Sequence, residues 1–350
     1  MTVSITPRGT IFARVVRSLA IAGGGRSAAL RFAESQGHGW MDVVQHLRAA
    51  VSAISQDDFA FNPVAFDLAE YLRPLTIIGR LAGLRRVPFD VNLYLGTAGA
   101  RAAFVAEGAP IPATDASYTG ATLRALKVGA IVALSKELVL NATPNAEATI
   151  SAEVGRALVE AMDLQFIDPT QAGVAGESPA SVTYGATQIP SSGSSVALID
   201  ADLEAMVGEL VAAQMTLNSA VWVMTPSSAT RMSLMRGSSG APAYPQITAR
   251  GGMLCGLPVV TSTACGGLGS PTARTITLLE AGEILLADDG GAALDYSDAT
   301  ALQMDSAPGA GPQSAVSMFQ TNSVAIRAVR QMNWQRRRDG AAVVLTGVTY

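Results

Sequence analysis

The sequence has few charged residues. Asp, Glu, Lys and Arg make up 15% of 350 residues, whereas apolar residues make up 49%. Soluble domains usually carry roughly 25% charged residues. The surplus apolar surface must therefore lie in a membrane or against other subunits. The charge-free run between Arg250 and Arg274 is interrupted by Gly and Pro, and a spanning helix needs about 20 mostly apolar residues. Since the high apolar fraction also excludes disorder, we expect a large subunit–subunit interface.

Cysteine and histidine are nearly absent. Cys255 and Cys265 are ten residues apart, which is neither a zinc nor a redox spacing, so we interpret them as small buried hydrophobic residues. His38 and His46 are eight residues apart, whereas a metal pair on one helix face needs a spacing of three or four. A Ser/His or Cys/His catalytic arrangement would need one of these histidines, and no G-x-S-x-G motif accompanies them. We therefore expect no cofactor, no metal and no enzymatic activity.

Charge is unevenly distributed. The net charge is −4; residues 1–50 carry six Arg and two acids, a balance of +4, so the other 300 residues carry −8. Arg14 and Arg17 interrupt the apolar run 11–22, which excludes a secretory signal and favours a protein made and used in a cytoplasm. Residues 1–60 contain helical patterns at 11–21 and 41–54, but we expect no independent core there and interpret them as an arm.

A loop follows the first strand pattern. Apolar residues alternate from Val87 to Leu95, which is strand period. Residues 96–120 then hold six Gly or Pro in 25 positions and few apolar groups. This composition predicts a projecting two-stranded loop, which is marginally stable unless it packs on a neighbour.

Downstream patterns predict a mixture of helices and strands. A strand is expected over 123–132 and a long helix over 144–167, with an apolar stripe at Ile150, Val154, Leu158, Met162 and Phe166. Residues 170–197 are rich in Gly, Ser, Thr and Pro, which indicates a mobile linker. Two helices and three strands then predict a compact α/β unit; we expect these helices at 200–216 and 227–235, the first with Leu203, Met206, Val207, Leu210 and Val211 buried, and these strands at 221–224, 257–260 and 275–279.

The C-terminal region predicts a hairpin. Residues 316–334 have the pattern of one long strand and 343–348 of another, and Asp339-Gly340 lies between them. Asp-Gly between two such runs is a strong hairpin signal. Arg336, Arg337 and Arg338 are then expected on its solvated tip.

Five stretches, in this order, resemble the major capsid protein family of tailed bacteriophages, with the Hong Kong 97 fold. They are Phe104–Asp115, Lys127–Leu138, Asn145–Asp168, Trp222–Pro226 with Gly256–Val260, and Phe319–Ile326. Each motif is weak alone, and the shared order gives the resemblance its weight over residues 60–350.

The resemblance implies an α+β Hong Kong 97-type capsid fold. Its parts would be an N-terminal arm, an extended β-hairpin loop, a peripheral domain with a long spine helix, and an axial domain. The implied limits are 1–60 for the arm, 93–124 for the extended loop, 61–92 with 125–198 and 313–340 for the peripheral domain, 145–167 for the spine helix, and 199–312 with 341–350 for the axial domain.

The resemblance also implies a function. The chain would be a structural subunit that self-assembles as hexamers and pentamers into an icosahedral shell around double-stranded DNA, without sequence specificity and without a membrane. Further partners would be a portal, a scaffold or maturation protease and a decoration protein, and the location would be the virion capsid, assembled in the host bacterial cytoplasm. The expected intersubunit contacts in the extended loop are Arg101, Phe104, Val105, Glu107, Ile111 and Asp115.

Two departures from the family are visible. Some members join subunits covalently through a lysine of the extended loop, but residues 93–124 contain no lysine, and Ile111 lies about where it would fall. Members often have a long charged prodomain, whereas residues 1–60 are shorter and weakly charged. Alternatives left open are the shell of a gene transfer agent, an encapsulin-like compartment and, in another class, a soluble α/β enzyme.

Overall fold

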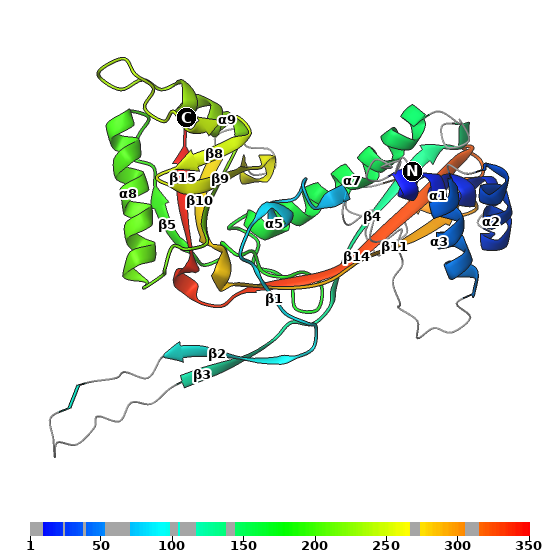
Figure 1. Cartoon of the computed structure of the whole chain (residues 1–350), viewed down its shortest axis with the longest axis horizontal. Coiled ribbons are helices and arrows are strands. Elements are labelled where there is room, and N and C mark those ends of the chain that lie inside the picture. Colours follow the sequence, from blue (N-terminus) through cyan, green and yellow to red (C-terminus); the bar gives the residue numbers. More distant parts are fainter. Residues whose placement is uncertain are drawn as a thin grey trace, which may run out of the picture. The chain divides into compact units, whose positions relative to one another are not determined.

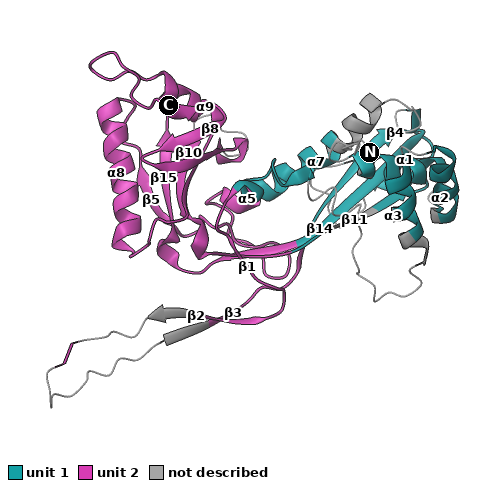
Figure 2. Cartoon of the chain, viewed as in Figure 1, with its two compact units in different colours: residues 1–80, 127–163, 289–331 teal, residues 81–126, 164–288, 332–350 magenta. Residues whose placement is uncertain are grey.

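The computed structural model describes most of the chain. The described residues are 10–23, 25–37, 40–52, 71–98, 104–105, 117–137, 144–266, 274–304 and 315–350. The chain divides into two compact units, shown in Figure 2. Unit 1 comprises residues 1–80, 127–163 and 289–331, and unit 2 comprises residues 81–126, 164–288 and 332–350.

Three helices pack together at the start of unit 1. They are α1 (Thr10–Ile21), α2 (Arg26–Ser35) and α3 (Met41–Ser52). The guanidinium groups of Arg14 and Arg17 lie 5.4 and 5.5 Å from the centroid of a Trp40 ring, which meets Phe32 edge to face at 5.8 Å. The buried apolar residues of the cluster include Ala13, Val16, Ala29, Ala33, Val43 and Leu47. The expectation of no core here is wrong, because alanines allow close helix contact and aromatic rings cover the arginines.

A long helix, α7 (Pro144–Ile167), has the predicted bounds, and the side chain of Ile150, the first residue of the predicted stripe, lies outside what is described. Val154, Leu158, Met162 and Phe166 are all buried. Gly155 permits a close approach, since a Cβ atom there would lie 2.8 Å from a ring carbon of Tyr71.

The short helix α5 (Ile77–Arg80) is tied to α7. The backbone N–H of Ile77 donates to a carboxylate oxygen of Asp163 at 2.8 Å, and both residues are buried. This bond satisfies an amide at the N-terminus of α5 that has no partner within the helix.

A four-stranded sheet has the order β1-β11-β14-β4, and a two-stranded sheet pairs β12 with β13. Their bounds are Arg85–Arg86 for β1, Leu126–Ser135 for β4, Ile284–Ser297 for β11, Ala301–Gln303 for β12, Ala315–Ser317 for β13 and Ser323–Arg336 for β14. The prediction of one strand over 316–334 is therefore wrong. The chain turns between β13 and β14, where Asn322 adopts φ +48°, which ends the extended conformation.

A seven-stranded sheet is the centre of unit 2, with the order β5-β15-β10-β6-β9-β8-β7 (Figure 1). Its strands are Thr187–Pro190 (β5), Ala220–Met224 (β6), Ile247–Thr248 (β7), Gly251–Leu254 (β8), Leu257–Thr261 (β9), Arg274–Glu280 (β10) and Ala342–Val348 (β15). Every residue of β6 is buried. Trp222 lies at 0% exposure, and its indole N–H donates to the carbonyl of Leu254 at 3.1 Å. The three strands expected at 221–224, 257–260 and 275–279 all lie in this sheet.

Two helices pack on this sheet, α8 (Val196–Ala212) and α9 (Pro226–Leu234). The hydroxyl of Thr225 accepts from the backbone N–H of Ser228 at 3.1 Å and caps α9. Helix α8 begins four residues before the predicted position. Its residue Val211 was expected to be buried but is exposed.

Candidate assembly surfaces

A two-stranded ribbon forms where the sequence predicts the extended loop. Strands β2 (Asn92–Ala98) and β3 (Ser117–Thr122) pair antiparallel, and neither joins another sheet of the described chain (Figure 1). The Thr122 hydroxyl donates to the side-chain carbonyl of Asn92 at 2.7 Å. Tyr94 is 79% exposed. Such a ribbon has no second layer of its own to bury its side chains.

The predicted contact residues of the loop fall mostly outside the described part of the chain. Phe104 is fully exposed and Val105 is also exposed. The other four, Arg101, Glu107, Ile111 and Asp115, lie outside the described residues, so their contacts remain predictions.

A small apolar cluster anchors the base of the ribbon in unit 2. Its buried members are Ala121, Leu123, Leu285 and Ala287, with Val87, Phe89 and Leu93 packed against them. The predicted continuous strand over 87–95 is only partly correct. Asp90 adopts φ +57°, and its backbone N–H donates to the carbonyl of Leu123 at 2.9 Å. The turn at Asp90 interrupts the strand, so β2 begins only at Asn92. Val87, Phe89 and Leu93 still pack in one cluster.

A pocket of about 490 Å³ lies beside this base. Its lining comes from three segments of unit 2: residues 122–126, residues 172–184 and the end of β14 with Asp339. Val174 and Tyr184 of the lining are 55% and 47% exposed. The pocket thus combines exposed apolar groups with polar side chains.

The end of β14 brings buried polar groups to the pocket. The side-chain amide of Asn333 donates to the carbonyl of Arg124 at 2.7 Å, and the indole N–H of Trp334 donates to the carbonyl of Ala180 at 2.9 Å. The guanidinium of Arg336 donates through Nη1 to the carbonyl of Val182 at 2.9 Å. Its side chain is 10% exposed, and its Nε has no hydrogen-bond partner among the described residues.

The segment 168–186 forms one wall of the pocket and is well ordered by hydrogen bonds. The Ser181 hydroxyl donates to the carbonyl of Phe166 at 2.8 Å, and the Thr183 hydroxyl donates to the carbonyl of Ile167 at 2.8 Å. Both hydroxyls are buried. The expectation of a mobile linker over 170–197 is therefore wrong, because its Ser and Thr side chains satisfy the last carbonyls of α7.

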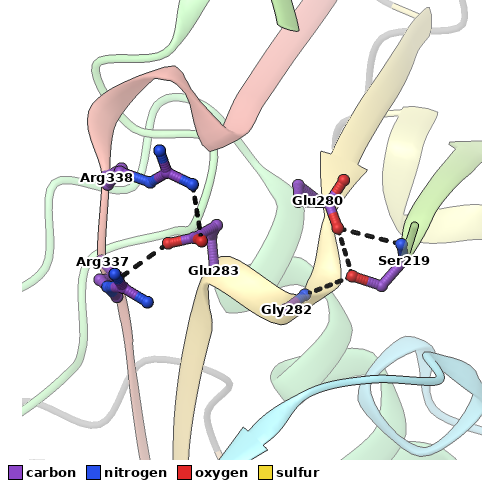
Figure 3. A network of polar contacts seen from close by, with 6 residues as sticks. All are labelled: Ser219, Glu280, Gly282, Glu283, Arg337 and Arg338. Atoms are coloured by element: carbon purple, nitrogen blue, oxygen red, sulfur yellow. Dashed lines mark hydrogen bonds and ion pairs between the residues drawn. The ribbon is translucent and has the colours of Figure 1, made fainter. Parts of the chain in front are cut away.

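An ion-pair network lies where β14 leads to β15 (Figure 3). Glu283 accepts from Arg338 at 2.7 Å and lies 3.5 Å from Arg337. The backbone N–H of Arg337 also donates to the carbonyl of Glu283 at 2.8 Å. Burial tends to raise the pKa of Glu283, but the hydrogen bond and charge of Arg338, with the charge of Arg337, lower it below its ordinary value.

The predicted C-terminal hairpin between β14 and β15 is wrong. Strand β14 lies between β11 and β4, whereas β15 pairs with β10 and β5, so the two strands are not partners. Asp339–Ala341 forms a short 3₁₀ turn. The three arginines are not a solvated tip either: Arg337 and Arg338 pair with Glu283, which is 12% exposed, and Arg336 is largely buried.

A second carboxylate, Glu280, is held beside this network. Its Oε1 accepts from the backbone N–H of Ser219 at 3.0 Å and also from the Ser219 hydroxyl. The hydroxyl oxygen in turn accepts from the backbone N–H of Gly282 at 2.9 Å (Figure 3). These bonds order the connection between β10 and β11.

A second pocket, of about 550 Å³, lies on α8. Its lining includes Leu203, Val207 and Val211 of that helix, and Cys255 from the turn between β8 and β9. Cys255 is exposed, contrary to expectation, whereas Cys265 is buried as expected. This pocket is a further apolar surface of unit 2.

The described residues show neither a metal site nor a membrane span. No group of three or more His, Cys, Asp or Glu side chains in them could hold a metal ion. Within the same part of the chain, no helix is both long and apolar enough to cross a bilayer. His38 and the side chain of His46 lie outside what is described.

Comparison with known proteins gives consistent matches. The family described as the phage capsid family matches residues 83–347. The capsid polyprotein of Pseudomonas phage PAJU2 is 37% identical over 368 residues, an alignment that covers 98% of this chain. That alignment covers 54% of the polyprotein, so the chain spans about half the length of this curated relative.

Solved structures share the fold. A chain of Mycobacterium phage Ogopogo has a TM-score of 0.58 at 17% identity, covering 77% of this chain and 91% of that one. A chain of Gordonia phage Cozz has a TM-score of 0.55 at 17% identity, covering 76% and 85%. The capsid of a native GTA particle has a TM-score of 0.51 at 14% identity, covering 77% and 89%. At these identities the likeness concerns the fold.

Proposed function

The chain belongs to the phage capsid family, and from that membership we propose that it is the major capsid protein of a tailed bacteriophage. As such it is a structural subunit that self-assembles into an icosahedral shell enclosing double-stranded DNA. The subunits form hexamers and pentamers, and no catalysis is involved. A portal and a scaffold or maturation protease act during assembly, and a decoration protein is a further candidate partner.

The proposal assigns the elements to capsid domains. Helix α7 serves as the spine helix, and the four-stranded sheet belongs with it to the peripheral domain. The seven-stranded sheet with α8 and α9 forms the axial domain, and β2 with β3 is the base of the extended loop. The shared fold with the capsid of the native GTA particle, together with the family match, supports these assignments.

The β2–β3 ribbon carries the proposal. In the described part of the chain its strands are paired only with each other, and Tyr94 of β2 is exposed, as is Phe104 further along the chain. Exposed aromatic groups on a strand pair without a covering layer are typical of a surface that another chain covers. With charged residues at 15% of the chain, a neighbouring subunit is the surface that fits this need.

A phage shell is favoured over the related alternatives. The relative with 37% identity is a phage capsid polyprotein, whereas the GTA capsid shares the fold at 14% identity. An encapsulin-like compartment would need a site that docks a protein cargo. Nucleic acid extracted from native particles distinguishes a phage shell from an encapsulin-like compartment. A phage shell yields nuclease-protected double-stranded DNA, whereas a compartment filled with protein cargo does not.

The test of shell formation is the particle size of the purified protein. We expect closed particles hundreds of ångströms across in negative-stain images, and a matching species in light scattering. Assembly should be tried alone and with a co-expressed scaffold. A folded protein that stays a monomer or small oligomer under both conditions contradicts the proposal.

A further inference from the structure

Arginines gather at one edge of the four-stranded sheet, where β1 runs beside the start of β11. Arg85 and Arg86 are the two residues of β1, and both are exposed. Strand β1 is the edge strand of the sheet, and it pairs with Leu285 and Leu286 of β11. Because successive residues of a strand point to opposite faces, the two arginine side chains leave this edge on both of its sides.

Two more arginines reach the same place from the end of β14. Arg337 and Arg338 lie 3.5 and 2.7 Å from Glu283, the residue that precedes β11 (Figure 3). Arg85 is close enough for its charge to act with those of Arg338 and Arg337 in lowering the pKa of Glu283 against the effect of burial. Together these residues form an arginine edge, which consists of Arg85, Arg86, Arg337 and Arg338.

Positive charge exceeds negative charge at the arginine edge. The carboxylates beside it are Glu283, which is 12% exposed, and Glu280, which is 3% exposed and held by Ser219. The exposed Asp339 pairs with Arg336, 3.4 Å away. Four arginines therefore stand against two largely buried carboxylates, a local balance of +2 in a chain whose net charge is −4.

The surroundings of these arginines favour a phosphate backbone over another protein as their partner. Among the described residues, none of the exposed large apolar side chains belongs to β1, to residues 281–286 or to residues 335–341. The centre of a protein–protein interface usually contains aromatic or other apolar anchors. A cationic surface without such anchors matches the backbone of DNA, whose phosphates bind guanidinium groups whatever the base sequence.

We propose that the arginine edge contacts the phosphate backbone of the packaged double-stranded DNA. The inference rests on the proposed shell function and adds to it which surface of unit 2 faces the interior. Arg85 and Arg86 contact phosphates directly, since both are exposed. Arg337 and Arg338 are 25% and 34% exposed, so they add positive charge to the surface while they remain paired with Glu283.

Binding of the unassembled full chain to a short DNA duplex of mixed sequence tests this surface. Fluorescence anisotropy gives the affinity at several salt concentrations, and each neutralised phosphate contributes about 0.9 to the slope of log affinity against log salt concentration. Arg85→Gln and Arg86→Gln should each reduce the slope by about 0.9 and weaken binding. Arg85→Lys should retain the slope, because the positive charge is kept.

Arg250→Gln is the matched control for these variants. Arg250 is an exposed arginine of unit 2 that lies outside the arginine edge, so its replacement should leave the slope unchanged. Failure of the wild-type chain to bind the duplex would overturn the proposal. So would a reduction of the slope in the control as large as that in the two edge variants.

A second experiment tests the contact inside the shell. Phenylglyoxal, which modifies accessible guanidinium groups, is applied to native DNA-filled particles and to particles emptied of DNA, and mass spectrometry measures the modification of each arginine. Arg85 and Arg86 should be protected in filled particles and modified in emptied ones, while Arg250 should react to the same extent in both. Protection in both kinds of particle would mean that a protein covers the edge. Modification in both would mean that DNA does not reach it, and either result contradicts the proposal.

The two proposals fail in different ways. If wild-type protein forms no shells under any condition, the proposed function is wrong. If shells form and hold DNA, but neither the salt slope nor the protection depends on Arg85 and Arg86, the function stands and the assigned surface is wrong. Circular dichroism of each variant separates misfolding from lost binding, and the protection experiment needs no substitution.

Discussion

Three consecutive arginines do not share one environment. Arg336 lines a pocket, Arg337 is 3.5 Å from Glu283, and Arg338 donates to the same carboxylate at 2.7 Å. A run of like charges is usually solvated. Here a single partly buried carboxylate pairs two of them, so their side chains order the backbone between β14 and β15.

Replacing Glu283 tests this pairing. Glu283→Gln should destabilise the subunit by about 1.5–3 kcal/mol at neutral pH, because the negative charge that Arg337 and Arg338 share is removed. Denaturant unfolding of the unassembled subunit measures the change. As a control, Asp295→Asn breaks the pair with Arg327, whose side chains are 51% and 57% exposed, and should change stability by at most about 1 kcal/mol.

The pH dependence has a definite sign. The pKa of Glu283 is lowered in the folded subunit, so its contribution is complete above the ordinary glutamate pKa and is lost as pH falls through the folded value. The stability difference between wild type and Glu283→Gln should therefore shrink as pH falls from about 5 to about 3. A difference that stays constant over this range contradicts the ionic account.

Lysine content leads to a prediction about covalent joining. Lys127 and Lys136 are the only lysines of the chain, and residues 93–124 contain none. Lys136 lies 3.5 Å from Asp298 within unit 1. Because a loop lysine is absent, mature shells should dissociate in boiling detergent to one band at the mass of a single subunit. A ladder of covalent multimers on the gel would show that another chemistry joins the subunits.

At the scale of elements, side-chain hydroxyls of the segment after α7 supply the hydrogen bonds that the last carbonyls of this helix lack. Ser181 and Thr183 bond the carbonyls of Phe166 and Ile167, and the backbone N–H of Val182 donates to the Phe166 carbonyl at 3.0 Å. The last turn of the helix is thereby satisfied by residues about 15 positions later. This arrangement positions one wall of the pocket.

Thr183→Val tests that role. Valine keeps the shape but leaves the Ile167 carbonyl without its buried donor, so we expect a loss of about 1–3 kcal/mol in unfolding free energy. Thr170→Val is the matched control: its hydroxyl bonds Asp168 at 2.8 Å in an exposed position, and the change should be within about 0.5 kcal/mol. Equal losses of unfolding free energy in the two variants would show that the buried hydrogen bond stabilises the subunit no more than the exposed one.

For the whole molecule, the composition of residues 96–120 gives them too few apolar groups to fold on their own. Fixing a residue costs about 1–2 kcal/mol of backbone entropy, and each large apolar side chain returns roughly 1.5–3 kcal/mol only when it is fully buried. Residues 96–120 offer few such groups, Phe104, Val105 and Ile111 with the amphipathic Tyr118, and Phe104 is fully exposed in the single subunit. Because the entropy cost of ordering exceeds the free energy that these side chains can return, the loop needs the surface of a neighbouring subunit.

Deletion of the loop separates folding from assembly. Replacing residues 97–119 by a short Gly/Ser linker should leave the circular dichroism and melting of the subunit close to wild type, because the ribbon's base is held by its own cluster around Leu123. Sedimentation should show no closed shells. Normal shells from this variant would mean that the loop is dispensable, and a collapsed melting curve would mean that it belongs to the subunit core.

The sequence by itself determined the elements whose signal is local. The buried positions of α7 from Val154 to Phe166, the buried strand β6 and the short helix expected at 227–235 follow from periodicity over a few residues. The structure has all three, with α9 at Pro226–Leu234. The order of weak motifs was enough to indicate the capsid family. The exposed ribbon was also predictable, because its composition lacks the apolar groups for a core.

Only the tertiary structure decided which distant segments meet. Asp339-Gly340 has the local chemistry of a hairpin turn, yet β14 and β15 pair with other strands, because β10 and β5 offer β15 a buried position. Arg336 looks like a surface charge in sequence and becomes a buried pocket residue through contacts with Val182, 154 positions away. Strand pairing and burial depend on contacts between remote residues, and local pattern does not encode them.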